Sequence, residues 1–143
     1  MTQVSAAATG SWGGLKEIRG ILLRLHKLLL DRERAAFEKV HGQIQASHDL
    51  LKLVINDEQF AWLHALSELI VRIDETLDLK DEASDDSLRS LLAEIRALLK
   101  PSEEGIGFAR KYFDAIQDDP ETVLTHAQAL KLLETRGGAK PGT

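Results

Sequence analysis

Residues 56–79, NDEQFAWLHALSELIVRIDETLDL, form the longest strongly patterned segment of the chain and are predicted to be its central helix. At about 100° per residue, one face of this helix collects a stripe of apolar side chains, and further apolar side chains widen it on both flanks. An apolar arc of this width needs neighbours on several sides, so we expect the helix to lie inside a bundle. The stripe consists of Leu63, Leu66, Ile70, Ile73 and Leu77, and the flanks add Phe60, Trp62, Leu69 and Val71.

The same helical spacing recurs on both sides of the central segment. A long first helix is predicted from Leu15, and it should end near His41 because Gly42 favours the left-handed conformation that follows many helices. Four later apolar segments follow good N-cap residues, which are Ser47, either Ser84 or Asp85, Ser102, and Asp119. We expect the last helix to direct Val123, Ala127, Leu130 and Leu133 inward, and no segment has the two-residue period of a strand.

These patterns predict an all-α protein, a single-domain irregular helical bundle of five to six helices. The length of 143 residues suits one domain with one core. Residues 1–14 are rich in Ala, Ser, Thr and Gly and are expected to form a flexible N-terminal arm. Residues 15–135 are expected to form the helical bundle domain, and residues 136–143, RGGAKPGT, a flexible C-terminal tail.

Composition excludes several classes of function. The chain has no cysteine, which removes disulfides, thiolate nucleophiles and clusters held by protein sulfur. Its net charge is -5 and its basic residues are scattered among acids, which argues against binding nucleic acid. No run approaches the roughly 20 apolar residues that span a bilayer, and the N-terminus lacks a signal-peptide pattern. We therefore expect a cytoplasmic protein that binds neither nucleic acid nor membrane.

Polar residues within the apolar stripes are the candidates for a buried site. His26 and Glu33 interrupt the stripe of the first helix, and His126 interrupts that of the last. Helical bundles hold metals with imidazole and carboxylate groups from facing helices. One alternative is therefore a metal- or haem-binding bundle with His26, Glu33 and His126 as ligands. The simpler interpretation is that each is a structural side chain that hydrogen-bonds to its neighbours in the core.

A second alternative is a small-molecule-binding bundle with a pocket lined by Trp62, Asp74, Phe108 and Tyr112. The sequence contains neither a complete Ser-His-Asp set that could be argued from its pattern nor a phosphate-binding loop. No known family matches its motifs residue by residue. The leading hypothesis is therefore an interaction or regulatory protein that associates with a protein partner or with itself, and that is not an enzyme.

Overall fold

The computed structural model describes residues 2–79 and 84–136, and it gives the burial of side chains from Trp12 to Glu134 within these ranges. Over the described residues the protein is all-α, as predicted, with six α-helices and one short 3₁₀ helix. The elements are α1 (Thr2–His41), α2 (Ser47–Asn56), the 3₁₀ helix η1 (Glu58–Leu63), α3 (His64–Asp78), α4 (Asp85–Leu98), α5 (Phe108–Asp118) and α6 (Pro120–Arg136). Among these helices, none is long and apolar enough to cross a membrane.

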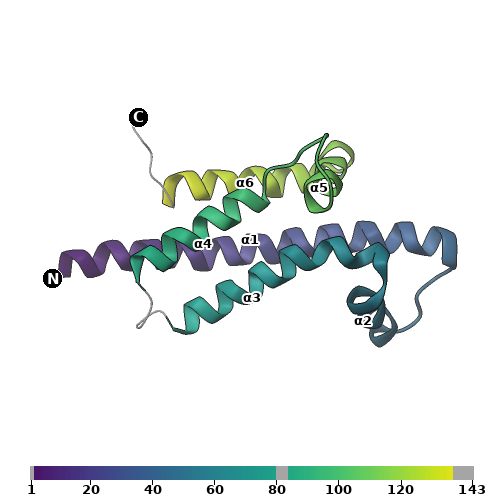
Figure 1. Ribbon diagram of the computed structural model, residues 1–143, viewed down its shortest axis with the longest axis horizontal. Helices are drawn as coiled ribbons and strands as arrows, with labels where there is room; N and C mark the ends of the chain where they lie inside the picture. The colour runs from purple at the N-terminus through teal and green to yellow at the C-terminus, as the bar shows by residue number, and fades with distance from the viewer. Residues whose placement is uncertain (1, 80–83, 137–143) are drawn as a thin grey trace.

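Helix α1 is the longest of the described helices and runs along the whole length of the bundle (Figure 1). Helices α3 and α6 pack on different sides of α1, and both run antiparallel to it. Helix α4 contacts α1, α3 and α6 and so closes the bundle. Helix α2 lies at the end of the bundle where α1 stops, and its main contact is with η1.

The core is built on the predicted stripe of the first helix. The first part of this stripe, Leu15, Ile18, Leu22, Leu25 and Leu29, is buried, whereas Ala36 and Val40, predicted to continue it, are exposed. The central segment contributes Phe60, Leu63, Leu66, Leu69, Ile70 and Ile73, which are buried as predicted, while Leu77 is partly buried. Val71, predicted to widen the stripe, is exposed instead. It lines a surface hollow of α3 together with Ser67 and Glu75.

Most helix ends follow the predicted capping residues. Helix α1 ends at His41, and Gly42 takes a φ of 93°. The Ser84 side chain accepts a hydrogen bond from the Ser87 backbone N–H at 3.0 Å and so caps α4. The Asp119 carboxylate accepts a hydrogen bond from the Thr122 hydroxyl at 2.6 Å at the start of α6.

The structure differs from the prediction at four helix boundaries. Helix α2 begins at Ser47 itself, so Ala46 and not Ser47 takes the N-cap position, and no side chain caps this helix. Helix α1 begins at Thr2, so it includes residues 2–14 of the expected flexible arm, and Trp12 anchors this part in the core. The central segment opens as the 3₁₀ helix η1 before α3 begins. Helix α5 begins at Phe108 and not after Ser102, because Gly107 has a φ of 60° that an α-helix does not allow. The expected tail lies outside the described residues except for Arg136, which ends α6.

The orientation of α6 also differs from the prediction. Leu133 is buried as expected, whereas Val123, Ala127 and Leu130 are exposed. The buried side of α6 instead carries Thr122, Thr125 and Ala129 together with Leu133. These small side chains allow α6 to lie close to α1, with which it makes its most extensive contact. Close packing therefore outweighs the burial of the larger aliphatic side chains.

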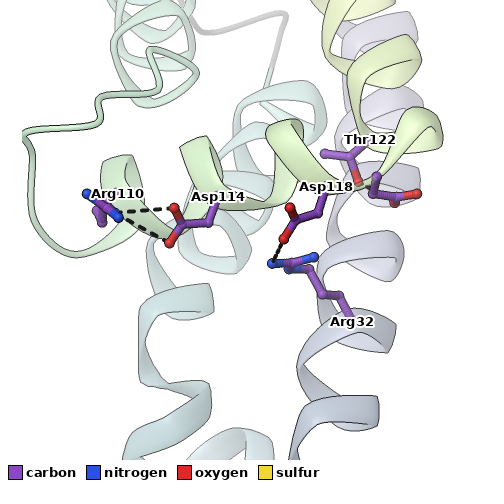
Figure 2. Close-up of polar contacts among 6 residues, drawn as sticks. Arg32, Arg110, Asp114, Asp118 and Thr122 are labelled. Carbon is purple, nitrogen blue, oxygen red and sulfur yellow. Dashed lines mark hydrogen bonds and ion pairs between the residues drawn. The ribbon is translucent and has the colours of Figure 1, made fainter.

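Polar contacts fix the corner between α5 and α6 against α1 (Figure 2). Arg32 of α1 pairs with Asp118 at the end of α5 at 2.8 Å, next to the hydrogen bond between Thr122 and Asp119 at the start of α6. Arg110 and Asp114 pair within α5 at 3.3 Å. Exposed pairs of this kind contribute at most about 1 kcal/mol each, so they orient the corner more than they stabilise it.

Two leucines of α1 provide a test of this core. Leu25 is fully buried, whereas Leu23, two residues earlier, is 43% exposed. We expect Leu25→Ala to lower the free energy of unfolding by roughly 2–5 kcal/mol, because it removes buried carbon and leaves a cavity. The control Leu23→Ala should cost less than about 1 kcal/mol. Urea denaturation of both variants measures the difference, and equal losses would contradict the placement of α1.

Candidate functional site

Glu33, one of the predicted metal ligands, links α1 to η1. Its side chain is buried, and its two oxygens accept hydrogen bonds from Gln59 Nε2 and Trp62 Nε1, both at 2.8 Å. Both donors come from η1, so the carboxylate fixes this short helix against the C-terminal part of α1. The bonds are charge-assisted, which makes them stronger than hydrogen bonds between neutral groups.

His126, the second predicted ligand, forms a pair with Tyr112 of α5. The Tyr112 hydroxyl lies 2.6 Å from His126 Nδ1, and the two rings meet edge to face with centroids 5.2 Å apart. Burial lowers the pKa of His126 and raises the pKa of Tyr112. Both groups are therefore neutral near pH 7, and the Tyr112 hydroxyl can donate to the unprotonated Nδ1. The pair joins α5 to α6.

His26, the third predicted ligand, contributes a buried ring nitrogen on α1. Its Nε2 atom has no hydrogen-bond partner among the described residues, and burial lowers the pKa of the ring. In the part of the chain that the structure covers, no group of three or more His, Asp or Glu side chains could hold a metal ion. His26, Glu33 and His126 are therefore not assembled into one such group.

The residues of the predicted small-molecule pocket divide into two places. Trp62, Phe108 and Tyr112 do come together, with neighbouring ring centroids 5.6 Å and 5.2 Å apart. Phe108 and Tyr112 are buried, so these rings pack against each other in the core. Asp74 lies on the side of α3 that faces Arg19 of α1, and the two form an ion pair. The aromatic part of the predicted set is thus a packing cluster that joins η1 to α5.

A surface that the sequence did not single out lies around α2. This helix of 10 residues has no buried residue, although its sequence SHDLLKLVIN is rich in aliphatic side chains. It is attached to the body through η1 and through a hydrogen-bond contact of 2.8 Å between His64 Nε2 and the Val54 carbonyl oxygen. One feature of the sequence could have indicated this surface. The aliphatic side chains of α2 cover an arc that is too wide for a short helix to bury against one neighbour.

The connection between α1 and α2 is held by two side chains of α1. The Ile44 backbone N–H donates to Glu38 Oε2 at 2.8 Å, and Arg34 donates to the Ile44 carbonyl at 3.4 Å and to Glu38 at 3.2 Å. The hydrogen bond from Ile44 and the contact with Arg34 together lower the pKa of Glu38. Ile44 itself is buried. These hydrogen bonds tie the loop before α2 to the C-terminal part of α1.

A hollow of about 600 Å³ lies between the end of α1 and α2. Phe37, Ile44 and Leu53 line it with apolar surface, and His41 stacks on Phe37 with ring centroids 4.3 Å apart. Polar side chains of α2, which are Asp49, Lys52 and Asn56, form part of its wall. The hollow therefore combines an apolar surface with a polar wall.

The two sides of α2 offer different surfaces. Asp49, Lys52 and Asn56 are spaced at three and four residues, so they share the side that faces the hollow. Leu51 and Ile55 lie on another side and are 58% and 57% exposed. Val40, near the end of α1, is also exposed. Apolar surface is thus available on more than one side of the same short helix.

Comparisons of this chain with protein-family models, with curated proteins and with solved structures find no match. The functional argument therefore rests on the geometry around α2 and on the polar contacts of the bundle.

Glu33 gives a test of the link between α1 and η1. We expect Glu33→Ala to lower the free energy of unfolding by roughly 1–3 kcal/mol, because the indole N–H of Trp62 and the amide of Gln59 lose their acceptor. The matched control is Glu68→Ala, which removes an exposed carboxylate on α3. Urea denaturation followed by tryptophan fluorescence reports both values. A loss no larger than that of the control would show that the link is not structural.

Two partly buried histidines, His26 and His126, give a pH dependence whose sign follows from their pKa shifts. Burial lowers the pKa of His26 and His126 in the folded state below the ordinary value of 6.5, so the unfolded chain binds protons more readily. Stability should therefore be highest above about pH 6.5 and should fall as the pH drops below that value. His26→Leu should reduce this slope between about pH 7.5 and pH 5.5.

The control for this pH dependence is His48→Gln, which changes an exposed ring on α2 and should leave the slope as it is in the unmodified protein. Urea denaturation at several pH values measures the slope for each variant. If His26→Leu and His48→Gln have the same effect, the buried ring does not cause the pH dependence.

Proposed function

We propose that this chain is a protein-interaction protein that binds an apolar segment of a partner protein through α2 and the adjoining hollow. The observation that carries the proposal is that α2 contains no buried residue while Leu51 and Ile55 are more than half exposed. Apolar surface gathered in one place on a folded protein is typical of an interaction site. Glu33 and His126, by contrast, are engaged in structural contacts within the bundle.

The distribution of apolar surface favours a protein partner over a small molecule. A small ligand in the hollow would cover Phe37 and Leu53 but would leave Leu51 and Ile55 on the other side of α2 exposed. A polypeptide can cover both sides of the helix at once, as amphipathic segments do in grooves of other helical proteins. Full burial of one Leu or Ile side chain contributes roughly 1.5–3 kcal/mol. Leu51 and Ile55 are each a little more than half exposed, so covering the exposed parts of both contributes a similar amount in total.

The way α2 is held supports the same proposal. The Glu38 and Arg34 contacts tie the loop before α2 to the end of α1, which limits the positions that the helix can take before a partner binds. Pre-organisation of this kind lowers the entropic cost of association. The polar side chains Asp49, Lys52 and Asn56 at the edge of the hollow can provide the hydrogen bonds of the rim.

Site-specific photo-crosslinking in cells tests this proposal. A photoreactive amino acid at position 51 or 55 should yield a discrete adduct with a second, different protein, which mass spectrometry identifies. The control position is Ala93, an exposed residue of α4 on the body of the bundle, where no such adduct should form.

A second variant connects the adduct to the apolar surface. Ile55→Lys should remove the adduct formed from position 51, because a charged side chain is costly to cover, and circular dichroism should show that the fold is retained. If positions 51 and 93 give the same adducts, or if Ile55→Lys has no effect on the adduct, α2 is not the binding element.

A further inference from the structure

Helix α2 stands between two residues with extended backbone. Ala46, before the helix, has a φ of -130° and a ψ of 151°, and Asp57, after it, has a φ of -87° and a ψ of 133°. Changes of φ and ψ at a few residues that end an element are enough to swing that element as a rigid body. The chain therefore has a hinge position at each end of α2 (Figure 1).

The segments beyond the two hinge positions are fixed to the body of the bundle. On the N-terminal side, the buried Ile44 donates its backbone N–H to Glu38 Oε2 at 2.8 Å. On the C-terminal side, Trp62 Nε1 of η1 donates to the buried carboxylate of Glu33, also at 2.8 Å. Rotation at the hinge positions therefore moves α2 and leaves the chain on either side of it in place.

One hydrogen bond from a side chain of the body holds α2 itself. His64, the first residue of α3, lies with its Nε2 atom 2.8 Å from the Val54 carbonyl oxygen. A carbonyl oxygen can only accept, so Nε2 carries the hydrogen. This carbonyl is one of the last four of α2, which have no partner within the helix. Among the described residues, no other side chain outside α2 hydrogen-bonds to it.

The side of α2 that faces the body is apolar. Leu50, Leu53 and Val54 are partly buried there and pack against the core. Leu53 also lines the hollow at the end of α1, together with Phe37. A swing of α2 away from the body would therefore join its inner side to the hollow in one larger apolar surface.

We propose that α2 is a hinged flap, latched by His64, which swings out to admit the apolar segment of the partner beneath it. This proposal rests on the function proposed above and adds how access to that site is controlled. Because α2 has no buried residue, only partly buried side chains and the latch oppose the opening. Loss of the latch therefore raises the fraction of open molecules, and a bound segment holds the flap open.

Thiol labelling of a Leu50→Cys variant measures the opening without any partner. The chain has no cysteine, so the introduced thiol is the only one that can react. Position 50 lies on the inner side of α2 and is partly buried when the flap is closed. Its labelling rate therefore rises with the fraction of molecules in which α2 is open.

Two amide variants of His64 have the same chemistry and differ in reach. In His64→Gln the amide nitrogen takes the place of Nε2, so it can still donate to the Val54 carbonyl. In His64→Asn the side chain is one methylene shorter and the hydrogen bond is lost. We expect His64→Asn to raise the labelling rate of Leu50→Cys about two- to tenfold, which is the range that one hydrogen bond accounts for. His64→Gln should keep the rate close to that of the chain with His64.

Two controls separate a swing of the whole helix from other motions. Ala93→Cys places a thiol on the exposed side of α4, where His64→Asn should not change the labelling rate. Amide hydrogen exchange of α2 is the second control, because a rigid swing keeps the hydrogen bonds inside the helix whereas local unfolding breaks them. We expect His64→Asn to increase the labelling rate at position 50 more than the amide exchange of α2.

Two outcomes of the labelling experiment would overturn the flap. Equal labelling rates at position 50 for His64→Asn, for His64→Gln and for the chain with His64 would show that this residue is not a latch. Equal increases in labelling and in amide exchange would show that α2 unfolds and does not swing on its hinges.

Photo-crosslinking from position 51 tests the role of the flap in binding. His64→Asn should increase the yield of the adduct, because the binding-competent state is more populated. An unchanged yield together with faster labelling would show that the partner does not enter beneath α2. If no adduct forms from position 51 in any variant, the proposed function fails, whereas the labelling rates still decide whether α2 opens.

Discussion

The buried stripe of α1 is the feature on which the rest of the structure depends. The side chains from Leu15 to Leu29 form one continuous apolar surface, and α3, α4 and α6 all pack against the helix that carries it. Because that surface is shared, each of the other helices needs to be apolar on one side only. The polar links at Glu33 and at the Tyr112–His126 pair then fix η1, α5 and α6 at defined positions along this scaffold.

Features of the fold that depend on local periodicity could be predicted from the sequence. The stripes of α1 and α3, the end of α1 before Gly42 and the cap at Ser84 all follow from spacing and residue type. The orientation of α6 could not be predicted in this way, because both of its faces are apolar and periodicity cannot rank them. The choice is made by close packing on α1, which selects Thr122, Thr125 and Ala129 for the interior.

Periodicity also did not predict which groups the interior polar residues contact. Their position inside apolar stripes was evident from the sequence, and the structure confirms that Glu33 is buried. Their partners come from elements distant in the chain, since Glu33 meets η1 and His126 meets α5. Helical spacing places a side chain on a face but does not say which element covers that face. The α2 surface was missed because the apolar pattern of α2 does not show which of its aliphatic side chains pack on η1 and which, like Leu51 and Ile55, stay exposed.

The attachment of α2 also has a consequence for local stability. This helix packs mainly on η1 and contributes no buried residue to the core, so it can unfold while the bundle around α1 stays intact. Its amide hydrogens should then exchange with solvent through local openings, at a lower free energy than those of α1 and α3. A partner that binds only folded α2 would make its local unfolding less favourable. Amide exchange would then slow in this one short helix and change little elsewhere.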